Sequence, residues 1–373
     1  MSRKIQPSKK IHSLEDARKL AKKRLPKMFF DFVDGAAGDE KLCELNSTAL
    51  DQIRLEPKVL RNVEKRSLSK KFFDINYNLP FGFAPMGMCD LTWPGADKML
   101  ANESLINNIP ACVSMASTTS LEKMYELTEG RSWLQLYIFQ DEKFVMELID
   151  RAKKTGYKTL VLTVDVPIQF RRAKDDKNGF TVPFKIGPKQ FFDFATHPNW
   201  SISTLFNGIP KPMNYETSKN GNKFVRSESR GSTDWETLKR IRNAWDGKLV
   251  VKGVMSQQDA LKIKNEGADA IQVSNHGGRQ LESATSAINA LPLIRETLGK
   301  EFPLIFDSGV RSGGDIVRAL AFGADYVMIG RPLMYAIGAD GARGLRKIIE
   351  IIIGELSTTC LLYTSPSPRD RVL

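Results

Sequence analysis

Eight short segments of the chain are apolar almost throughout, and most of them end in a polar residue or a glycine. Continuous apolar runs are typical of strands that are buried on both faces, as in a parallel sheet. Amphipathic helical stretches separate most of these segments; one of them, 256–267, begins with a serine N-cap and ends with a glycine. Eight such strand–helix units predict an α/β fold, the (β/α)8 TIM barrel. The predicted strands are 79–85, 109–114, 133–137, 159–165, 249–253, 270–276, 303–309 and 326–331.

Two regions fall outside this repeat. Ser13-Leu-Glu-Asp16 resembles a capping box, which predicts an N-terminal helical segment that belongs to the folded body. Residues 173–233 follow the fourth predicted strand without a clear helix-and-strand unit, so we expect a long loop at the active-site face. The pattern thus predicts one domain over residues 1–359, with an atypical tail at 360–373.

Side chains capable of chemistry stand at the carboxyl ends of the predicted strands. In a TIM barrel these ends converge on one face, where active sites are built. One or two such residues could be hydrogen-bonded polar residues of the core, but that explanation does not cover so many strands at once. The residues are Ser114, Gln135, Tyr137, Thr163, Asp165, Lys252, His276, Asp307 and Arg331.

Of the three histidines, only His276 stands at the end of a predicted strand. In the segment 271–280, Ile-Gln-Val-Ser-Asn-His-Gly-Gly-Arg-Gln, it follows an apolar strand and precedes two glycines and an arginine. His12 lies in a basic leader and His197 precedes a proline. If a histidine is the acid/base catalyst of this protein, it is His276.

Two glycine-rich turns predict a phosphate site. Asp-Ser-Gly-Val-Arg-Ser-Gly-Gly at 307–314 follows the seventh strand, and Gly330-Arg331 follows the eighth. Barrels commonly bind phosphate there through backbone N–H groups and the start of a short helix. Arg311 and Arg331 could add charge-assisted hydrogen bonds. Together the turns indicate a phosphorylated cofactor.

Composition narrows the function classes. The 373 residues are 42% hydrophobic, and no apolar run approaches the roughly 18 residues of a membrane-spanning helix. The four cysteines form no CxxC pair, which argues against structural zinc and a disulfide framework and favours the cytoplasm. The net charge is +12, and residues 1–27 hold ten Lys or Arg against two acidic residues. Because no aromatic residues interleave these charges, we expect a solvated helix face and no nucleic-acid partner.

Several motifs, in their order and spacing, resemble the FMN-dependent α-hydroxy acid dehydrogenase and oxidase family, which includes L-lactate dehydrogenase, mandelate dehydrogenase and glycolate oxidase. The resemblance extends from about residue 13 to about residue 359, far beyond a single motif. The motifs are Leu25-Pro-Lys27, Gln135-Leu-Tyr137, Thr163-Val-Asp165, Arg171-Arg172, Val251-Lys-Gly253, Ser274-Asn-His-Gly-Gly-Arg-Gln280, Asp307-Ser-Gly309 and Gly330-Arg-Pro332.

The resemblance implies that FMN is the cofactor and assigns residues to it. A cation such as Lys252 near the flavin would stabilise the negative charge that the ring gains on reduction. Ala84 and Pro85 would approach the ring through their backbone. The ring would be held by Ser114, Gln135, Thr163 and Lys252, with Ser274 beside them, and the ribityl phosphate by Asp307, Gly309, Arg311, Gly330 and Arg331.

The resemblance also implies the substrate-binding and catalytic residues. Arg172 and Arg279 would clamp a carboxylate, although either could instead form a structural ion pair. Tyr137 would hydrogen-bond the substrate hydroxyl, or else be a core tyrosine. His276 would be the general base, with Asp165 orienting it and stabilising the imidazolium; Lys252 completes the catalytic set. Whether the α-carbon proton or the hydroxyl proton leaves first stays open.

Three positions depart from the family pattern. Phe32 stands where relatives carry a tyrosine that hydrogen-bonds the substrate carboxylate. Losing that bond costs about 1.5–3 kcal/mol, which predicts weak affinity or an unusual substrate. Ala116 replaces a bulky tryptophan of glycolate oxidase and leaves room for a larger side chain. Glu282 stands where aspartate is common, and we expect it to influence the site indirectly, through the residues that line it.

The insertion and the end of the chain carry further expectations. The apolar cluster Phe191-Phe-Asp-Phe194, Trp200 and Leu205-Phe206 lies in a stretch with nine Lys or Arg against five acidic residues. It resembles the segment that ties lactate and mandelate dehydrogenases to membranes; the alternative is a packed lid without a membrane role. After Thr359, the Ser-Pro repeats cannot extend the final helix of the family, which suggests a truncated gene or non-native reading frame and lower stability.

The predicted function is FMN-dependent oxidation of an L-2-hydroxy acid, lactate-like or mandelate-like, to the 2-oxo acid, with electrons passing to a quinone or another acceptor. Gly87 stands where oxidase relatives tend to carry alanine, which favours a dehydrogenase. The alternatives are an oxygen-using oxidase, another FMN barrel such as an isomerase, and a catalytically impaired flavin-binding protein. The resemblance further implies a homotetramer, cytoplasmic or attached to the inner face of the cytoplasmic membrane.

Overall fold

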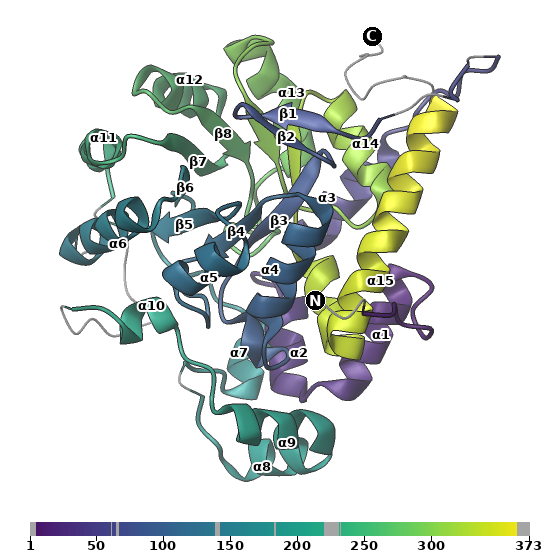
Figure 1. Cartoon of the computed structure of the whole chain (residues 1–373), viewed down its shortest axis with the longest axis vertical. Helices are drawn as coiled ribbons and strands as arrows, with labels where there is room; N and C mark the ends of the chain where they lie inside the picture. Colours follow the sequence, from purple (N-terminus) through teal and green to yellow (C-terminus); the bar gives the residue numbers. More distant parts are fainter. Residues whose placement is uncertain are drawn as a thin grey trace.

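The computed structural model describes residues 5–60, 62–64, 67–138, 142–182, 184–219, 231 and 233–363. Eight parallel strands form a closed barrel in the order β10-β3-β4-β5-β6-β7-β8-β9, so that β10 also pairs with β3 (Figure 1). The predicted TIM barrel is confirmed, and each predicted strand overlaps one barrel strand. The strands are β3 (Phe81–Met86), β4 (Ala111–Ser114), β5 (Trp133–Tyr137), β6 (Thr159–Thr163), β7 (Lys248–Val254), β8 (Ala270–Val273), β9 (Leu304–Phe306) and β10 (Tyr326–Ile329).

The strand register brings the polar strand ends together at the carboxyl-terminal end of the barrel. Ser114 of β4 pairs with Gln135 of β5, and Tyr137 of β5 pairs with Thr163 of β6. Thr163 in turn pairs with Lys252 of β7. Since all residues of β4, β6, β8, β9 and β10 are buried, these strands need apolar side chains on both faces, which explains their continuous apolar pattern.

A hairpin closes the opposite, amino-terminal end of the barrel. Strands β1 (Lys70–Phe72) and β2 (Ile75–Tyr77) pair antiparallel. The Phe72 ring lies 5.1 Å from the ring of Tyr326 and 6.1 Å from that of Trp133, the first residues of β10 and β5. This end of the barrel is filled by aromatic rings, whereas a cavity opens at the carboxyl ends of the strands.

Helices surround the barrel. Side-chain caps set several of their starts: Ser120, Asp234, Ser256 and Ser312 each accept a hydrogen bond from the backbone N–H three residues later. The outer elements are the 3-10 turn η1 (Cys89–Leu91) and the helices α4 (Ala96–Asn107), α5 (Leu121–Leu127), α6 (Glu142–Thr155), α11 (Trp235–Ala244), α12 (Gln257–Asn265), α13 (Ala287–Leu298), α14 (Gly313–Ala321) and α15 (Arg331–Tyr363).

The N-terminal helical segment consists of α1 (Leu14–Arg24), α2 (Lys27–Asp34) and α3 (Lys41–Gln52). Ser13 caps α1, as predicted, by accepting a hydrogen bond from Asp16 N at 3.1 Å. The Asp16 side chain in turn accepts from the backbone N–H of His12 at 3.1 Å.

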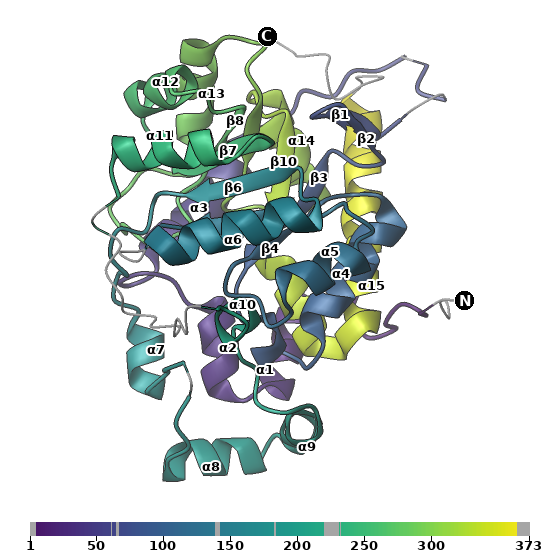
Figure 2. The same ribbon diagram turned by 60° about the vertical axis from the view of Figure 1, so that its left-hand side comes forward.

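The part of the insertion after β6 that the structure describes contains four short helices. Helices α8 and α9 project from one end of the molecule in both views (Figures 1 and 2). The sequence predicted no helix-and-strand unit here, and it did not reveal these helices because each is only one to three turns long, too short for a sustained apolar period. The four are α7 (Ala173–Asn178), α8 (Pro188–Ala195), α9 (Pro198–Asn207) and α10 (Met213–Glu216).

The final helix continues beyond the end expected from the sequence. Helix α15 runs through Cys360 to Tyr363, with a kink at Asp340 and Gly341, and buries Ile352 and Leu356. The Ser-Pro repeats, which suggested a break in the native sequence, lie outside the described residues. In the described part of the chain, no helix combines the length and apolar character needed to cross a membrane.

Candidate active site

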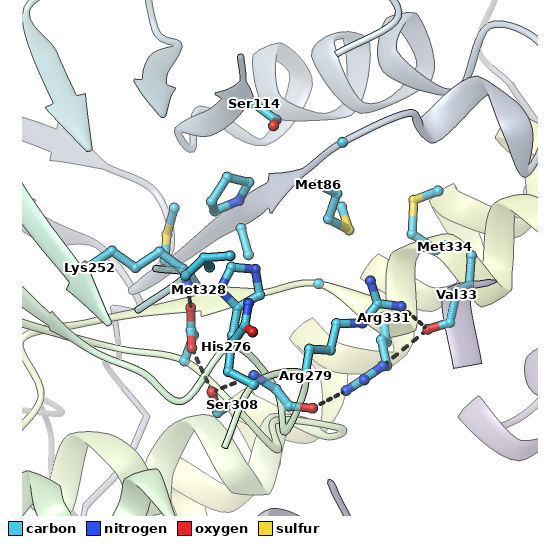
Figure 3. Close-up of a pocket in the computed structure, with 18 of the residues that line it drawn as sticks. Val33, Met86, Ser114, Lys252, His276, Arg279, Ser308, Met328, Arg331 and Met334 are labelled. Atoms are coloured by element: carbon cyan, nitrogen blue, oxygen red, sulfur yellow. Dashed lines mark hydrogen bonds and ion pairs between the residues drawn. The ribbon is translucent and has the colours of Figure 1, made fainter. Parts of the chain in front are cut away.

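A cavity lies at the carboxyl ends of the barrel strands, and most of the residues predicted from the sequence line it (Figure 3). Four predicted residues lie just behind its wall: Asp165 contacts His276, Ser274 contacts Lys252, Gln135 contacts Ser114, and Thr163 contacts Gln135. The predicted residues in the wall are Ala84, Pro85, Ser114, Tyr137, Arg172, Lys252, His276, Arg279, Asp307, Gly309, Arg311, Gly330 and Arg331.

His276 lies between a carboxylate and a phenol. Its Nδ1 is 2.9 Å from Asp165 Oδ1 and 3.2 Å from Asp165 Oδ2, and its Nε2 is 3.4 Å from the Tyr137 hydroxyl. A carboxylate that accepts the Nδ1–H proton fixes the tautomer in which Nε2 carries the lone pair. The arrangement therefore leaves Nε2 able to take up a proton.

The backbone around His276 is shaped to make this contact. His276 has φ +59°, in the left-handed region, and its N–H donates to Ser274 Oγ at 3.1 Å. On the neighbouring strand, a Cβ at Gly253 would lie 2.5 Å from Asp165 Cβ. Only glycine leaves room there for Asp165 to reach the imidazole.

Burial is the main cause that lowers the pKa of His276 below its ordinary value of 6.5. The charge of Lys252 lowers it further, and the carboxylate of Asp165 partly opposes the shift. Burial also opposes ionisation of Asp165, but the charges of His276 and Lys252 outweigh it and hold the carboxyl pKa below its usual range. At neutral pH the pair is an imidazole beside a carboxylate.

Lys252 is a buried cation with polar partners. Its Nζ donates to Ser274 Oγ at 3.0 Å and lies 3.7 Å from Asp307 Oδ2. Burial alone would lower the pKa of Lys252, yet the charges of Asp307 and Asp165 raise it overall, so the ammonium form persists. A fixed positive charge therefore stands in the cavity wall.

Polar side chains cross three adjacent strands beside Lys252. Ser114 Oγ donates to Gln135 Oε1 at 3.1 Å, and Gln135 Nε2 donates to Thr163 Oγ1 at 3.0 Å. Ser114 lies across the cavity from His276 and Arg279 (Figure 3). This row offers both donors and acceptors, as the heteroatom edge of a flavin ring would require.

At the other end of the cavity two arginines lie close together. Arg331 donates to the carbonyl oxygens of Gly277, Gly35 and Val33 at 2.8, 3.0 and 3.2 Å. The pKa of Arg311 is lowered, first by burial and then by the charge of Arg331. An anion between them would remove this repulsion, so the pair fits a phosphate. The donor set as a whole fits FMN.

The third part of the cavity would hold the substrate. Arg279 donates to the backbone carbonyls of Phe32 and Val33, and its guanidinium lies 5.5 Å from the centre of the Phe32 ring. Arg172 lines the cavity with its side chain 8% exposed, whereas the Arg171 side chain is 80% exposed and pairs with Asp176. The structure thus distinguishes the two adjacent arginines.

Two residues that support the site were missed in the sequence. Ser308, with φ +82°, accepts the N–H groups of Asn275 and Gly277 and donates to Asp307 Oδ1 at 2.8 Å. Gln272 Nε2 donates to Asp307 Oδ2 at 2.6 Å. A glutamine inside the apolar strand β8 was the available signal, because a buried amide needs a partner. Glu282 accepts from Asp39 N at 2.6 Å, so it holds the loop before α3.

Comparison with known proteins agrees with this geometry. A family model described as FMN-dependent dehydrogenase matches residues 21–370. The chain belongs to the FMN-dependent dehydrogenase family. It is 36% identical to (S)-mandelate dehydrogenase of Pseudomonas putida over 371 residues, covering 97% of this chain and 94% of that protein. It is 34% identical to L-lactate dehydrogenase of Pseudomonas syringae pv. syringae (strain B728a), covering 94% of each.

Solved structures extend the similarity. The crystal structure of the monotopic membrane protein (S)-mandelate dehydrogenase superposes with a TM-score of 0.90 at 34% identity, covering 96% of this chain and 97% of that one. A mandelate oxidase structure superposes with a TM-score of 0.82 at 30% identity, covering 96% of each. As a member of the FMN-dependent dehydrogenase family, the protein is an oxidoreductase of the type that acts on 2-hydroxy acids.

The Asp165–His276 contact generates a pH prediction. Because the unprotonated imidazole is the base, kcat/KM should rise with pH through the His276 pKa, with a midpoint below 6.5. Asp165→Asn removes the charge that raises this pKa, so the midpoint should move to lower pH while kcat falls on the order of 10²- to 10⁴-fold. The exposed Asp176→Asn is the control and should change neither. A midpoint above 6.5, unmoved in Asp165→Asn, would contradict the assignment.

Proposed function

We propose that the protein oxidises an L-2-hydroxy acid to the 2-oxo acid in this cavity. The observation that carries the proposal is the neutral imidazole of His276, held by Asp165 and facing Tyr137 at 3.4 Å, within a cavity that Arg172 and Arg279 also line. A base, a phenol and two guanidinium groups are the groups needed to hold and deprotonate a 2-hydroxy carboxylate.

Each side chain then has a role. The guanidinium groups of Arg172 and Arg279 bind the substrate carboxylate, for which their planar donor geometry is suited. The Tyr137 hydroxyl donates to the substrate hydroxyl oxygen. His276 Nε2 takes up a proton, and Asp165 stabilises the imidazolium that results. Bound FMN would supply the acceptor for the two electrons and the second proton that the substrate loses. Lys252 supplies positive charge against the negative charge that accumulates.

The cavity wall favours a substrate with a sizeable side chain. Ala116 lines the cavity together with Val166 and Val182, all of them apolar and none of them aromatic. The small Ala116 leaves space that a bulky residue would fill. A mandelate-like acid therefore fits this wall at least as well as lactate. We infer that the electrons pass to a quinone or another acceptor, and the implied homotetramer stays a prediction.

Helices α8 and α9 support an attachment to the membrane surface. Their inner side packs on α2, where the Phe29 ring lies 4.6 Å from Trp200 and 5.8 Å from Phe194. Their outer side exposes apolar side chains. The hairpin of α8 and α9 therefore packs against the protein on one side and exposes apolar side chains on the other. The first side fits a packed lid, and the second fits an interfacial element. The exposed residues are Ile186, Phe191, Phe192, Ile202, Leu205, Phe206 and Ile209.

An exposed apolar surface of this kind is typical of an interfacial element. Lys185, Lys189 and Lys211 accompany it in the sequence and would favour anionic lipid. The similar (S)-mandelate dehydrogenase structure is described as a monotopic membrane protein. We therefore propose peripheral attachment through α8 and α9, at the inner face of the cytoplasmic membrane.

The function is tested by following the flavin absorbance anaerobically during addition of L-lactate, (S)-mandelate or glycolate. At least one should bleach the flavin, and His276→Ala should slow bleaching on the order of 10²- to 10⁴-fold because it removes the base. His197→Ala, in the insertion, is the control and should bleach like the wild type. A yellow protein that none of the acids reduces would instead indicate a flavin-binding protein without this activity.

Phe32→Tyr should improve substrate binding. Phe32 lies in the cavity wall beside Arg279, so a hydroxyl added to its ring would reach the carboxylate-binding region. One hydrogen bond to a charged group contributes about 1.5–3 kcal/mol, so we expect KM to fall about tenfold or more with kcat little changed. Phe180→Tyr adds the same hydroxyl to the ring stacked on Phe32 at 4.6 Å, outside the cavity wall, and should leave KM unchanged. An unchanged KM in Phe32→Tyr would show that this position does not face the carboxylate.

The membrane proposal predicts binding to vesicles of phosphatidylcholine and phosphatidylglycerol. The double variant Leu205→Glu, Phe206→Glu should bind at least about tenfold more weakly in co-sedimentation, since each apolar side chain contributes roughly 1.5–3 kcal/mol when buried. Turnover with a water-soluble acceptor should not change. Asn207→Glu adds charge to the same helix without removing apolar surface and is the control. Equal binding of both variants would argue for a lid without a membrane role.

A further inference from the structure

The loop 115–119, between β4 and α5, is part of the substrate cavity and touches its neighbours there. Ala116 lines the cavity, and its carbonyl accepts from Met88 N at 2.9 Å, just beyond the end of β3. Met115 Sδ accepts from the backbone N–H of Tyr137 at 3.0 Å. A displacement of this loop would therefore move a cavity wall and the backbone of Tyr137 together.

Asp97 of α4 fixes the far end of the loop. Its Oδ2 accepts from Thr118 N at 2.7 Å, from Thr118 Oγ1 at 2.7 Å and from Thr119 N at 2.9 Å. Asp97 is buried, so these three hydrogen bonds form away from competing water. They hold residues 118 and 119 but do not reach the part of the loop that lines the cavity.

Asn214 of α10 holds the near end of the loop. Its Nδ2 donates to Met115 O at 3.0 Å and to Ser117 Oγ at 3.4 Å, and its Oδ1 accepts from Leu121 N at 2.8 Å. The residue is fully buried, at 0% exposure. A buried amide whose two donors and acceptor are all bonded to one loop and the helix after it fixes that loop in a single position.

Helix α10 is itself held firmly, although it belongs to the insertion and lies beside the start of α5 (Figure 1). Met213 N donates to Ser117 O at 3.0 Å, and Arg151 of α6 donates to Asn214 O at 3.1 Å. The Tyr215 ring lies 4.6 Å from the Phe144 ring of α6. The side chain of Asn214 thus extends from a fixed support toward the loop.

We propose that Asn214 is a positioning residue through which the insertion sets the shape of the substrate cavity. It acts on Ala116 and Tyr137 through Met115, without touching the substrate. Its effect therefore falls on which hydroxy acid is preferred, beyond any effect on stability. This inference rests on the proposed oxidation of a 2-hydroxy acid.

The test compares Asn214→Ala and Asn214→Asp with the wild type, all loaded with flavin. Asn214→Asp keeps the volume and the acceptor for Leu121 N but lacks the donors to Met115 O and Ser117 Oγ, and it serves if Asn214→Ala does not fold. We expect the ratio of kcat/KM for (S)-mandelate to that for L-lactate to change by at least about tenfold, because sub-ångström to ångström displacements have effects of this size. Glu216→Gln, exposed on the same helix, should leave the ratio unchanged.

A second variant tests Met115, the residue through which Asn214 is proposed to act on Tyr137. Met115→Leu conserves volume but removes the sulfur that accepts from Tyr137 N. If Asn214 acts through Met115, the double variant should change the ratio by clearly less than the product of the single changes. Independent, multiplicative effects would overturn this route.

Two further measurements distinguish a failure of the inference about Asn214 from a failure of the proposed function. Thermal unfolding and flavin content report stability, and flavin spectral changes on titration with benzoylformate and pyruvate report binding without turnover. A lower Tm in Asn214→Asp with unchanged selectivity in turnover and in binding would show a purely structural role and overturn the inference. If no hydroxy acid reduces the wild type, the proposed function fails, while the relative affinities for the two oxo acids still test Asn214.

Discussion

The contact between the buried carboxylate of Asp165 and the imidazole of His276 constrains the site more than any other interaction. Gly253 lacks a Cβ where one would collide with Asp165, and His276 adopts a positive φ that few non-glycine residues adopt. Both features cost conformational stability unless the contact is made. Asp165 follows β6 and His276 follows β8, with Gly253 on β7 between them, so the order of strands in the closed barrel brings the carboxylate and the imidazole within hydrogen-bonding distance.

The remaining charges of the cavity follow from burial. Lys252 lies among Asp307, Asp165 and Ser274, so its positive charge is balanced within the protein. Arg311 and Arg331 instead repel one another, and the carbonyl oxygens that Arg331 contacts carry no full charge. At the Lys252 end of the cavity the buried charges therefore balance one another. At the end with Arg311 and Arg331, the two positive charges are suited to an anion. A phosphorylated cofactor satisfies both ends at once, which is consistent with the FMN-dependent family.

The sequence predicted the barrel and the grouping of the candidate site residues at one cavity because both leave local patterns. Buried parallel strands are apolar throughout, and the site residues stand directly at their ends, as Lys252 and His276 do. The short helices of the insertion leave no such pattern, and neither do contacts such as Asn214 to Met115, which join residues about 100 positions apart in the chain. Position 272 did leave a signal, a glutamine within an apolar strand. The continuation of α15 through Cys360 could not be read locally, because its support comes from packing of the whole helix.

The insertion combines an exposed surface with firm anchorage to the site. Lys174 of α7 bonds Asp34 and Glu40 at 2.9 and 2.8 Å, the α8–α9 hairpin packs on Phe29, and Asn214 of α10 holds the cavity loop. Three attachments along one insertion limit how far its parts can move independently. The proposed lipid-binding face would then rest on the same framework that, as we propose, shapes the substrate cavity. Through this anchorage a segment outside the barrel repeat would bear on the chemistry at the strand ends, as proposed for Asn214.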